Sequence, residues 1–349
     1  MIDITPHNYL TVRIPPFSSI KISKLLHQQE FHIFLKQNLN NIYSMNMSGC
    51  YQLYSVPTIP NLTILHCNSC RVLTSIASQP NLNILDCNSC RTLTSIAAQP
   101  NLTSLNCNGC WILGSLDMLP KLTTLHCNEC AKLSTIPLMP NLNTLICYGC
   151  LILTEIPFLA NLTILDCSVC AVSSLPVLPK LTTLNCSMCH LLSIPVLPNL
   201  ISLNCTQCMY LSHIPVLPKL TSLICNNCVR LTDIPVLPKL NTLVCNGCVS
   251  LNPMPIPPNL TNLQWRGHIL DRINRIIYPS LKALHDQNLI TTVKLHKKPE
   301  DTITECSICY ETGNISITKC NHTYHQQCLN NWFKTSKSYT CPYCRTTLA

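Results

Sequence analysis

The sequence predicts an α+β multidomain protein: a solenoid of short parallel strands with a proline-rich convex side, followed by a small zinc-stabilised module. Three observations support this prediction. A unit of about twenty residues recurs from residue 42 to residue 265. Cysteine accounts for 27 of the 349 residues and proline for 26, whereas glycine accounts for only 7. Residues 302–349 combine cysteine and histidine at short, paired spacings.

These patterns divide the chain into four segments. Residues 1–41 are expected to form an N-terminal helical cap, because the open end of a solenoid needs covering and apolar residues in 20–41 are spaced as in a helix. Residues 42–265 form the predicted solenoid. Residues 266–301 are expected to form a second helical cap and a polar linker, and residues 302–349 the zinc module.

Cysteine content approaches that of disulfide-rich secreted domains. The first thirty residues contain no apolar core of a signal peptide, and no apolar run reaches the ~18 residues of a membrane span. We therefore expect a cytoplasmic protein without a membrane partner, whose cysteines pack, bind metal or catalyse. The net charge is +9, but lysine and arginine are scattered, so no nucleic-acid partner is expected.

The repeat reads L-x-x-L-x-C-x-x-C-x-x-L-x-x-I-P. First cysteines of successive pairs are 20 residues apart, except for two steps of 19 after Cys167 and Cys186. Both short units lose one residue between the second cysteine and the following Leu/Ile-Pro. We expect a loop there, because a one-residue slip inside a strand would exchange its two faces.

This unit resembles the leucine-rich repeat, L-x-x-L-x-L-x-x-N/C-x-L. The resemblance implies a short strand on the concave face of each repeat, with Leu62, Leu65 and Cys67 pointing inward and Cys70 filling the turn. The proline-rich tail, as in Ile-Pro-Val-Leu-Pro-Lys from Ile214, predicts extended or polyproline-like convex segments rather than helices.

The ten C-x-x-C pairs admit three interpretations: zinc half-sites, redox motifs, or a stack of small buried hydrophobes. Met47 replaces the first cysteine in the first unit, and Trp265 occupies that position in the last half-unit. Neither side chain can replace a thiolate on zinc, which favours the stack. Stacked thiols on strands ~4.8 Å apart also lie at a spacing that permits disulfides on oxidation.

Several Asn-x-Ser/Thr triplets occur, among them those at Asn61, Asn101, Asn161 and Asn259. In a secreted protein they would be glycan acceptors. Each of these four follows proline or alanine at an expected turn, so we interpret them as turn residues.

One strand position per repeat is expected to face solvent on the concave side. The position is polar with few charges and becomes partly apolar toward the C-terminal end, which suits a protein or peptide better than a phosphate backbone. An unengaged, solvated face is the alternative. The column consists of Asn46, His66, Asp86, Asn106, His126, Ile146, Asp166, Asn185, Asn204, Ile224, Val244 and Gln264.

The C-terminal segment contains eight soft or imidazole ligands at paired spacings, which predict two tetrahedral Zn²⁺ sites of four ligands each. The segment is too short for a sufficient hydrophobic core, so metal binding must supply folding energy. The predicted ligands are Cys306, Cys309, Cys320, His322, His325, Cys328, Cys341 and Cys344.

This series resembles the RING finger in its two-histidine form. The resemblance implies a cross-brace, in which alternate pairs hold each zinc. All coordination positions are then filled, so the metals are structural and no thiolate remains as a nucleophile. The implied sets are Cys306, Cys309, His325 and Cys328 for one zinc, and Cys320, His322, Cys341 and Cys344 for the other.

The resemblance also implies an activity. Most RING fingers recruit a ubiquitin-charged conjugating enzyme and promote transfer to a substrate lysine, so we expect a RING-type E3 ubiquitin transferase without a catalytic cysteine. Ile308, Trp332 and Pro342 match the family's apolar groove for the conjugating enzyme. Arg345 matches the basic residue that bridges that enzyme and ubiquitin, which is catalysis by positioning. The implied partners are the conjugating enzyme, ubiquitin and a substrate protein of unknown identity on the repeats.

Two other hypotheses stay open. The chain is alternatively a non-enzymatic scaffold with a structural zinc finger, in which Ile308 and Trp332 simply pack and Arg345 is solvated. A multi-zinc storage or redox protein would instead use the repeat cysteines. The near-identical, Asn- and Ile-rich repeats are also similar to those of giant-virus proteins, which would place the chain in a host cytoplasm.

Overall fold

The structure is a computed structural model. It forms two compact units, Met1–Lys294 and Leu295–Ala349, which are described separately. Among the described residues, no helix is long and apolar enough to span a bilayer. The structure describes residues 1–252, 257, 259–265, 292–295, 315–317 and 323–325, so most of the predicted second cap and linker lies outside it.

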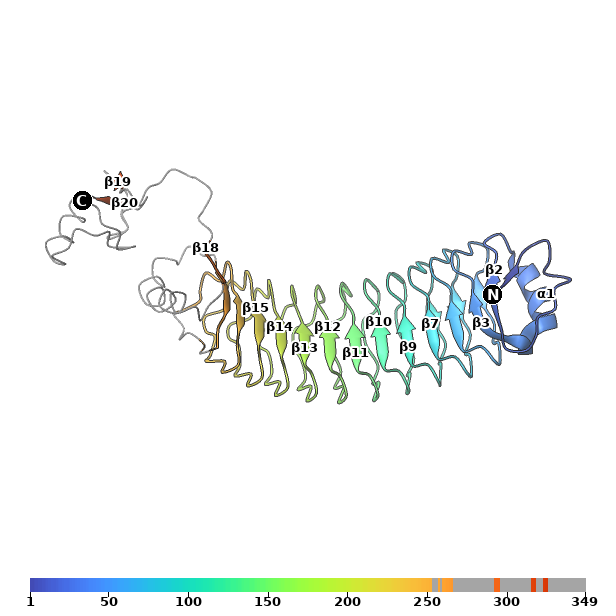
Figure 1. The fold of residues 1–349 in the computed structure, drawn as a ribbon. Coiled ribbons are helices and arrows are strands. Elements are labelled where there is room, and N and C mark those ends of the chain that lie inside the picture. Colours follow the sequence, from blue (N-terminus) through green and yellow to red (C-terminus); the bar gives the residue numbers. More distant parts are fainter. Residues whose placement is uncertain (253–256, 258, 266–291, 296–314, 318–322, 326–349) are drawn as a thin grey trace. The chain divides into compact units, whose positions relative to one another are not determined.

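The first unit is a solenoid in which successive turns add one strand each to a single sheet (Figure 1). Strand order follows chain order, and every pairing given for these strands is parallel. The strands are β1 (Ile2–Ile4), β2 (Ser18–Ile22), β3 (Ile42–Asn46), β5 (Ile64–His66), β7 (Ile84–Asp86), β9 (Ser104–Asn106), β10 (Thr124–His126), β11 (Thr144–Ile146), β12 (Ile164–Asp166), β13 (Thr183–Asn185), β14 (Ser202–Asn204), β15 (Ser222–Ile224), β16 (Thr242–Val244), β17 (Asn262–Trp265) and β18 (Thr292–Leu295).

The opposite, proline-rich side is extended, as predicted. Three short strands, β4 (Ser55–Val56), β6 (Ser75–Ile76) and β8 (Ser95–Ile96), form a second parallel sheet there. Later repeats keep only isolated parallel bridges, such as Glu155 to Ser174. From Pro137 onward, proline replaces Ala77 and Ala97 of the earlier repeats and lacks the N–H through which those alanines bond to the preceding repeat.

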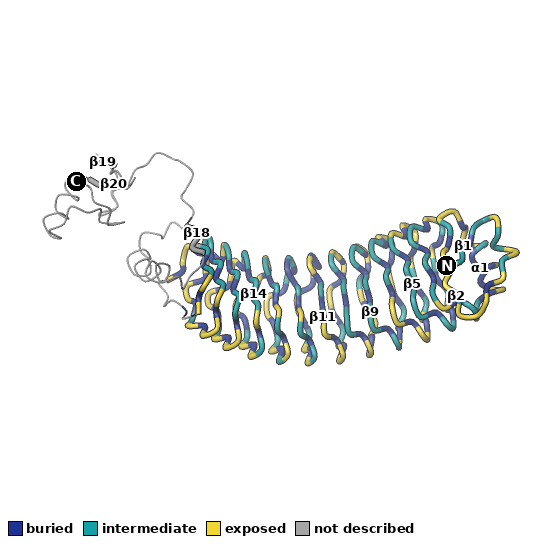
Figure 2. Tube along the Cα trace, viewed as in Figure 1, coloured by how far each residue is buried: buried dark blue, intermediate teal, exposed yellow. Residues whose placement is uncertain are grey.

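The leucines and cysteines of each unit fill the interior. Leu62, Leu65, Cys67 and Cys70 have no exposed surface, which confirms their predicted inward positions. The same pattern recurs along the solenoid, whose interior is a continuous buried column (Figure 2). Each repeat covers the apolar surface of its neighbours, so its stability depends on nearest-neighbour contacts.

The two short units keep the sheet in register. Leu165 pairs with Leu184, and Leu184 with Leu203, although both steps are one residue shorter than the rest. The missing residues fall after Cys170 and Cys189, in the turn that follows the second cysteine. The predicted loop position of the deletion is confirmed.

A residue in the left-handed region precedes the second cysteine of each described repeat. Its φ lies between 56° and 75°. This conformation turns the chain so that its N–H reaches the next repeat, as in the 2.7 Å bond from Ser69 N to Asn88 O. The positions are Gly49, Ser69, Ser89, Gly109, Glu129, Gly149, Val169, Met188, Gln207, Asn227 and Gly247.

The N-terminal segment contains more than a helix. Helix α1 (Gln28–Asn38) and the single turn η1 (Leu39–Asn41) follow β1 and β2, which continue the sheet beyond the predicted start at residue 42. Phe31 and Phe34 of α1 are fully buried. The side chain of Gln28 accepts from Tyr54 N at 2.9 Å and donates to Ser55 O at 3.1 Å, which ties α1 to β4.

Candidate functional site

The zinc module is described only in part. A hairpin of β19 (Ile315–Ile317) and β20 (Thr323–His325) pairs antiparallel, with Ile315 opposite His325. Predicted ligands Cys320 and His322 belong to the stretch that connects these strands. His325, another predicted ligand, is the last residue of β20. The other seven predicted ligands, and Ile308, Trp332, Pro342 and Arg345, lie outside the described residues.

The donor set fits zinc. Six cysteines and two histidines supply thiolate and imidazole ligands, and the set contains no carboxylate that would favour calcium or magnesium. Eight such donors suffice for two tetrahedral sets of four. Such a donor set is typical of structural zinc, which stabilises a fold.

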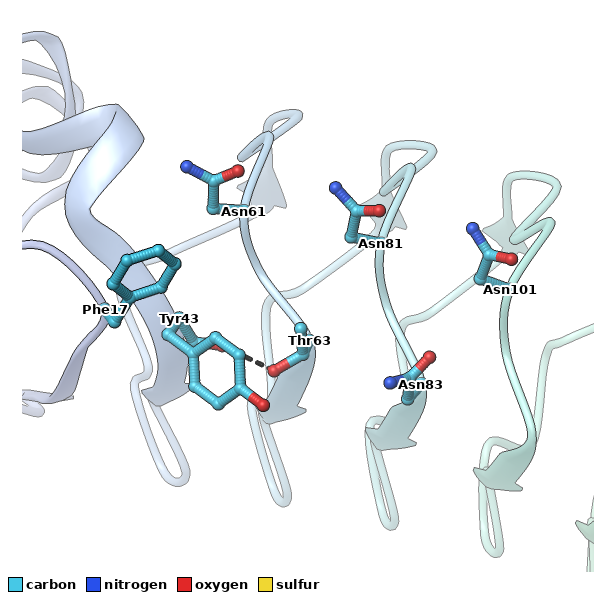
Figure 3. Close-up of a pocket in the computed structure, with 7 residues that line it drawn as sticks. All are labelled: Phe17, Tyr43, Asn61, Thr63, Asn81, Asn83 and Asn101. Carbon is cyan, nitrogen blue, oxygen red and sulfur yellow. Dashed lines mark hydrogen bonds between the residues drawn. The ribbon is translucent and has the colours of Figure 1, made fainter.

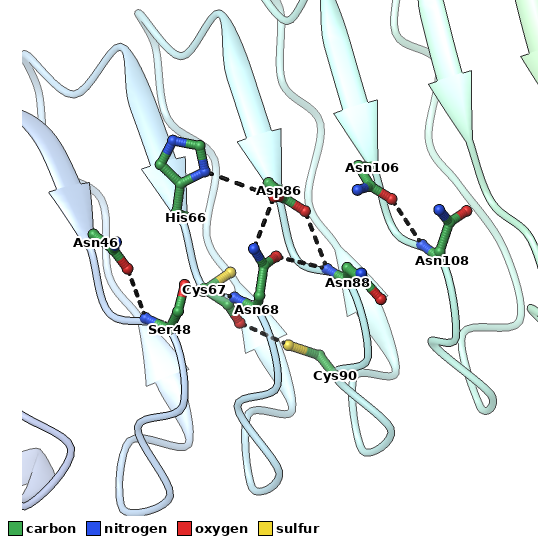
Figure 4. A network of polar contacts seen from close by, with 10 residues as sticks. All are labelled: Asn46, Ser48, His66, Cys67, Asn68, Asp86, Asn88, Cys90, Asn106 and Asn108. Carbon is green, nitrogen blue, oxygen red and sulfur yellow. Dashed lines mark hydrogen bonds and ion pairs between the residues drawn. The ribbon is translucent and has the colours of Figure 1, made fainter.

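The second cysteine of each solenoid pair donates a hydrogen bond to the preceding repeat. Its Sγ lies 2.9–3.2 Å from the backbone oxygen of the residue at the first-cysteine position one repeat earlier. Cys90 and Cys67 show this contact in Figure 4. The donors are Cys70, Cys90, Cys110, Cys130, Cys150, Cys170, Cys189, Cys208, Cys228 and Cys248.

These contacts give the solenoid cysteines a structural role. All 21 are free and buried, and burial raises the pKa of Cys50 to about 12 and the pKa of Cys245 above its usual range. Hydrogen bonding to Cys110, together with burial, raises the pKa of Cys87. Protonated thiols such as these three are poor ligands and nucleophiles. Hydrogen bonding from neighbouring thiols instead lowers the pKa of Cys150 to about 5 and the pKa of Cys248 to about 4. Within the described part of the chain, no group of three or more histidine, cysteine or acidic residues could hold a metal ion.

The predicted concave column exists as a continuous row. Cross-strand pairing brings Asn46 opposite His66, His66 opposite Asp86, and so on to Val244 opposite Gln264. Each of its residues is half-buried. His66 and His126 are separated by Asp86 and Asn106, so they do not form a metal pair.

The acidic residues of this row, Asp86 (Figure 4) and Asp166, are engaged by neighbours. Asp86 accepts from Asn68 Nδ2 at 2.8 Å and lies 3.7 Å from His66 Nδ1. Asp166 likewise accepts from Asn185 Nδ2 at 2.9 Å and from Ser168 N at 3.0 Å. These bonds orient the carboxylates along the row, which leaves a surface of fixed polar groups with little free charge.

A cavity of about 410 Å³ opens at the N-terminal end of the solenoid (Figure 3). Phe17 and Tyr43 meet edge to face at one side, with ring centroids 6.4 Å apart. The sequence pattern does not predict this pocket, because Phe17 precedes the repeats and no periodic signal connects it to them. The lining residues are Phe17, Tyr43, Asn61, Thr63, Asn81, Asn83 and Asn101.

The asparagines of the Asn-x-Thr triplets are turn residues, as expected. Nδ2 of Asn61 donates to Asn40 O at 2.7 Å, and Nδ2 of Asn101 donates to Pro80 O at 2.6 Å. Asn161 and Asn259 make the equivalent bonds to the preceding turn, at 2.8 and 2.6 Å. Their side chains therefore join consecutive turns.

Comparison with known proteins concerns mainly the C-terminal module. The Ring finger domain family model matches residues 304–345, which include all eight predicted zinc ligands and Ile308, Trp332, Pro342 and Arg345. The chain thus combines a parallel β-solenoid that resembles leucine-rich-repeat proteins with a RING finger domain near its C-terminus. RING finger domains bind zinc.

The matching relatives bear the name E3 ubiquitin-protein ligase. The chain is 32% identical over 90 residues to listerin of Schizosaccharomyces pombe, covering 24% of this chain and 6% of that protein. It is 43% identical over 44 residues to human TRAIP, with coverage of 12% and 9%. To AIRP1 of Arabidopsis thaliana it is 35% identical over 72 residues, covering 20% and 45%. The chain therefore spans less than half of each of these relatives.

Among solved structures, the chain is similar to YopM from Yersinia enterocolitica, with a TM-score of 0.34 and 17% identity over 72% of this chain and 68% of that one. A leucine-rich repeat protein from Bacteroides ovatus matches with a TM-score of 0.34 and 16% identity, covering 72% and 76%.

Proposed function

We propose that this chain is a RING-type E3 ubiquitin-protein ligase that acts in a eukaryotic cytoplasm. In this proposal the RING finger recruits a ubiquitin-charged conjugating enzyme, and the repeats bind the substrate protein. The observation that supports it most is the family match at residues 304–345, which spans every predicted ligand and contact residue. Names of the relatives that match this region support the same activity.

In the proposed mechanism, the eight ligands would bind zinc, which would stabilise the module without supplying a reactive position. Two ions would be held by Cys306, Cys309, His325 and Cys328, and by Cys320, His322, Cys341 and Cys344. Ile308, Trp332 and Pro342 then form the apolar contact for the conjugating enzyme. Arg345 donates to that enzyme and to ubiquitin, and so holds the thioester where a substrate lysine can attack.

The transfer proceeds without a cysteine intermediate on this chain. Six cysteines of the module would serve as metal ligands, and the 21 solenoid thiols are buried rather than exposed nucleophiles. Ubiquitin therefore passes directly from the conjugating enzyme to the substrate, and the ligase accelerates this step by orientation alone.

An in vitro reaction with ubiquitin, activating enzyme and a panel of conjugating enzymes tests the activity on the zinc-loaded full chain. Ile308→Ala and Trp332→Ala should abolish chain formation while zinc stays bound, whereas Trp111→Ala, at a half-exposed solenoid tryptophan, should not. Arg345→Ala should slow discharge without weakening enzyme binding, and Arg71→Ala serves as its control. Absence of chains with every conjugating enzyme would reject the ligase and leave the scaffold hypothesis.

For substrate binding we propose the concave column. Its carboxylates are already hydrogen-bonded, and its C-terminal part, Ile224 and Val244, is apolar, a combination that suits a protein surface. The triple variant Ile146→Lys, Ile224→Lys, Val244→Lys should lose substrate ubiquitination but keep self-ubiquitination. The control Thr58→Lys lies on the opposite side of the solenoid. Retention of all substrates in the triple variant would exclude this face.

A further inference from the structure

A row of exposed apolar side chains runs along the convex side of the solenoid, parallel to its long axis. It takes one residue from each of seven consecutive repeats, and each is 51–63% exposed. We call this row the convex ridge: Met118, Leu138, Phe158, Val177, Val196, Val216 and Val236.

The ridge is not a consequence of repeat architecture. In the three preceding repeats the same position holds Thr58, Ser78 and Ala98. Hydroxyl groups of Thr58 and Ser78 donate to the next repeat, at 2.9 and 2.7 Å, so the fold accepts polar residues there. Apolar residues in all seven later repeats therefore leave a surface with no partner within the described solenoid.

The area of the ridge is that of a protein interface. Seven half-exposed side chains present on the order of 700 Å² per copy, whereas the largest apolar patch of an ordinary monomer covers about 300–600 Å². Standard interfaces bury about 800 Å² per partner. Each copy would therefore contribute nearly that area when two ridges are placed together.

Charges of opposite sign flank the ridge. Three residues after it, exposed lysines form a row on one side: Lys121, Lys180, Lys219 and Lys239. Three residues before it, Glu155 and Asp233 are exposed on the other side. In an extended chain these offsets lie on opposite flanks, so Lys239 and Asp233 of one repeat lie on opposite flanks of the ridge.

We propose that the convex ridge is the surface through which two copies of this chain form a symmetric dimer, with the two-fold axis along the ridge. This axis brings the lysine flank of one copy against the acidic flank of the other, and Asp233 opposite Lys239 of the second copy. A two-fold axis across the ridge would instead oppose the two lysine rows. The proposal is independent of ligase activity.

Sedimentation equilibrium of the zinc-loaded full chain tests the dimer. We expect twice the chain mass of 39.0 kDa. The double variant Val196→Lys, Val216→Lys should raise the dimer Kd at least 100-fold, while Ser78→Lys, Ala98→Lys at the matched positions should leave it unchanged. Circular dichroism checks that each variant is folded. A monomeric parent chain, or a dimer that survives the ridge variant, overturns the proposal.

A charge exchange tests the direction of the axis. Asp233→Lys and Lys239→Asp each place two like-charged pairs in their own homodimer, but a mixture of the two variants forms two attractive pairs. We expect each variant alone to dimerise several-fold more weakly, and the mixture to form heterodimers with the parental Kd. Equal homodimer and heterodimer affinities would overturn the proposed axis.

Discussion

Sγ of Cys90 lies 2.9 Å from the backbone oxygen of Cys67, one repeat earlier in the stack. Nine further second cysteines repeat this contact, at 2.9–3.2 Å. The first cysteine of each pair has another role, since it fills an apolar slot that Met47 also fits. Two cysteines three residues apart therefore serve different purposes, one as donor and one as filler.

We expect the two positions to respond oppositely to serine and alanine. Cys90→Ser keeps a donor for the Cys67 carbonyl, so Cys90→Ala should be less stable than Cys90→Ser by about 1 kcal/mol. At Cys87, a filler position, Cys87→Ser should be the less stable of the pair, because it buries a hydroxyl. Urea unfolding of the four variants measures these differences. The same order at both positions would contradict the distinction.

Replacing a strained left-handed turn residue with glycine should stabilise the solenoid. Val169 has a φ of 59°, which a β-branched side chain adopts only with strain. Val169→Gly should raise the free energy of unfolding by about 1 kcal/mol, because a left-handed L-residue costs ~1–2 kcal/mol. Gly149→Ala, at φ 71° in the adjacent repeat, should lower it by a similar amount. Thermal unfolding measures both, and a destabilised Val169→Gly would contradict the argument.

Alkaline pH should weaken the solenoid. Burial raises the pKa of Cys50 from 9.0 to about 12, so the folded state holds its proton more tightly than the unfolded state. This contribution is complete below pH 9 and is lost as pH rises from 9 toward 12. Urea midpoints at pH 7, 8.5 and 10 should therefore fall above pH 9, and less steeply in Cys50→Ala. A constant midpoint would contradict the raised pKa.

The number of zinc ions bound per chain tests whether the C-terminal module binds metal and the solenoid does not. Native mass spectrometry should find two Zn²⁺ per chain, because the eight C-terminal ligands are predicted to form two complete tetrahedral sets. Cys306→Ser should lower zinc content, whereas Cys67→Ala should leave it at two. Removal of zinc by a chelator should abolish the proposed ligase activity without unfolding the repeats. Circular dichroism monitors the fold of the repeats. Several additional ions per chain would instead support metal storage by the repeat cysteines.

Periodicity explains what the sequence could predict about the fold. Leucine and cysteine recur at fixed spacing, so inward positions, strand register and the place of the one-residue deletions follow from sequence alone. The left-handed turn does not, because Ser69, Glu129 and Val169 occupy it as well as glycine. Strands β1 and β2 were also missed, since they precede the repeats and lack the cysteine pair that marks a unit.

Some features of the candidate site could likewise be predicted from the sequence, and others could not. Zinc ligands are recognisable from spacing, because cysteine and histidine have few other reasons to occur at such intervals. The concave column follows from the two-residue period of a strand. The pocket beside Phe17 and Tyr43, and the ties that hold Asp86, depend on contacts between segments far apart in sequence. Such contacts produce no periodic pattern in the sequence.

The parallel register of the sheet has a consequence for how this protein can change. Every column gains one side chain per unit, and each unit bonds only to its two neighbours. Whole units can therefore be inserted or removed without disturbing the ends, and near-identical coding segments recombine readily out of alignment. The length of the proposed substrate-binding surface is therefore set by the number of repeats, and it changes in steps of one repeat.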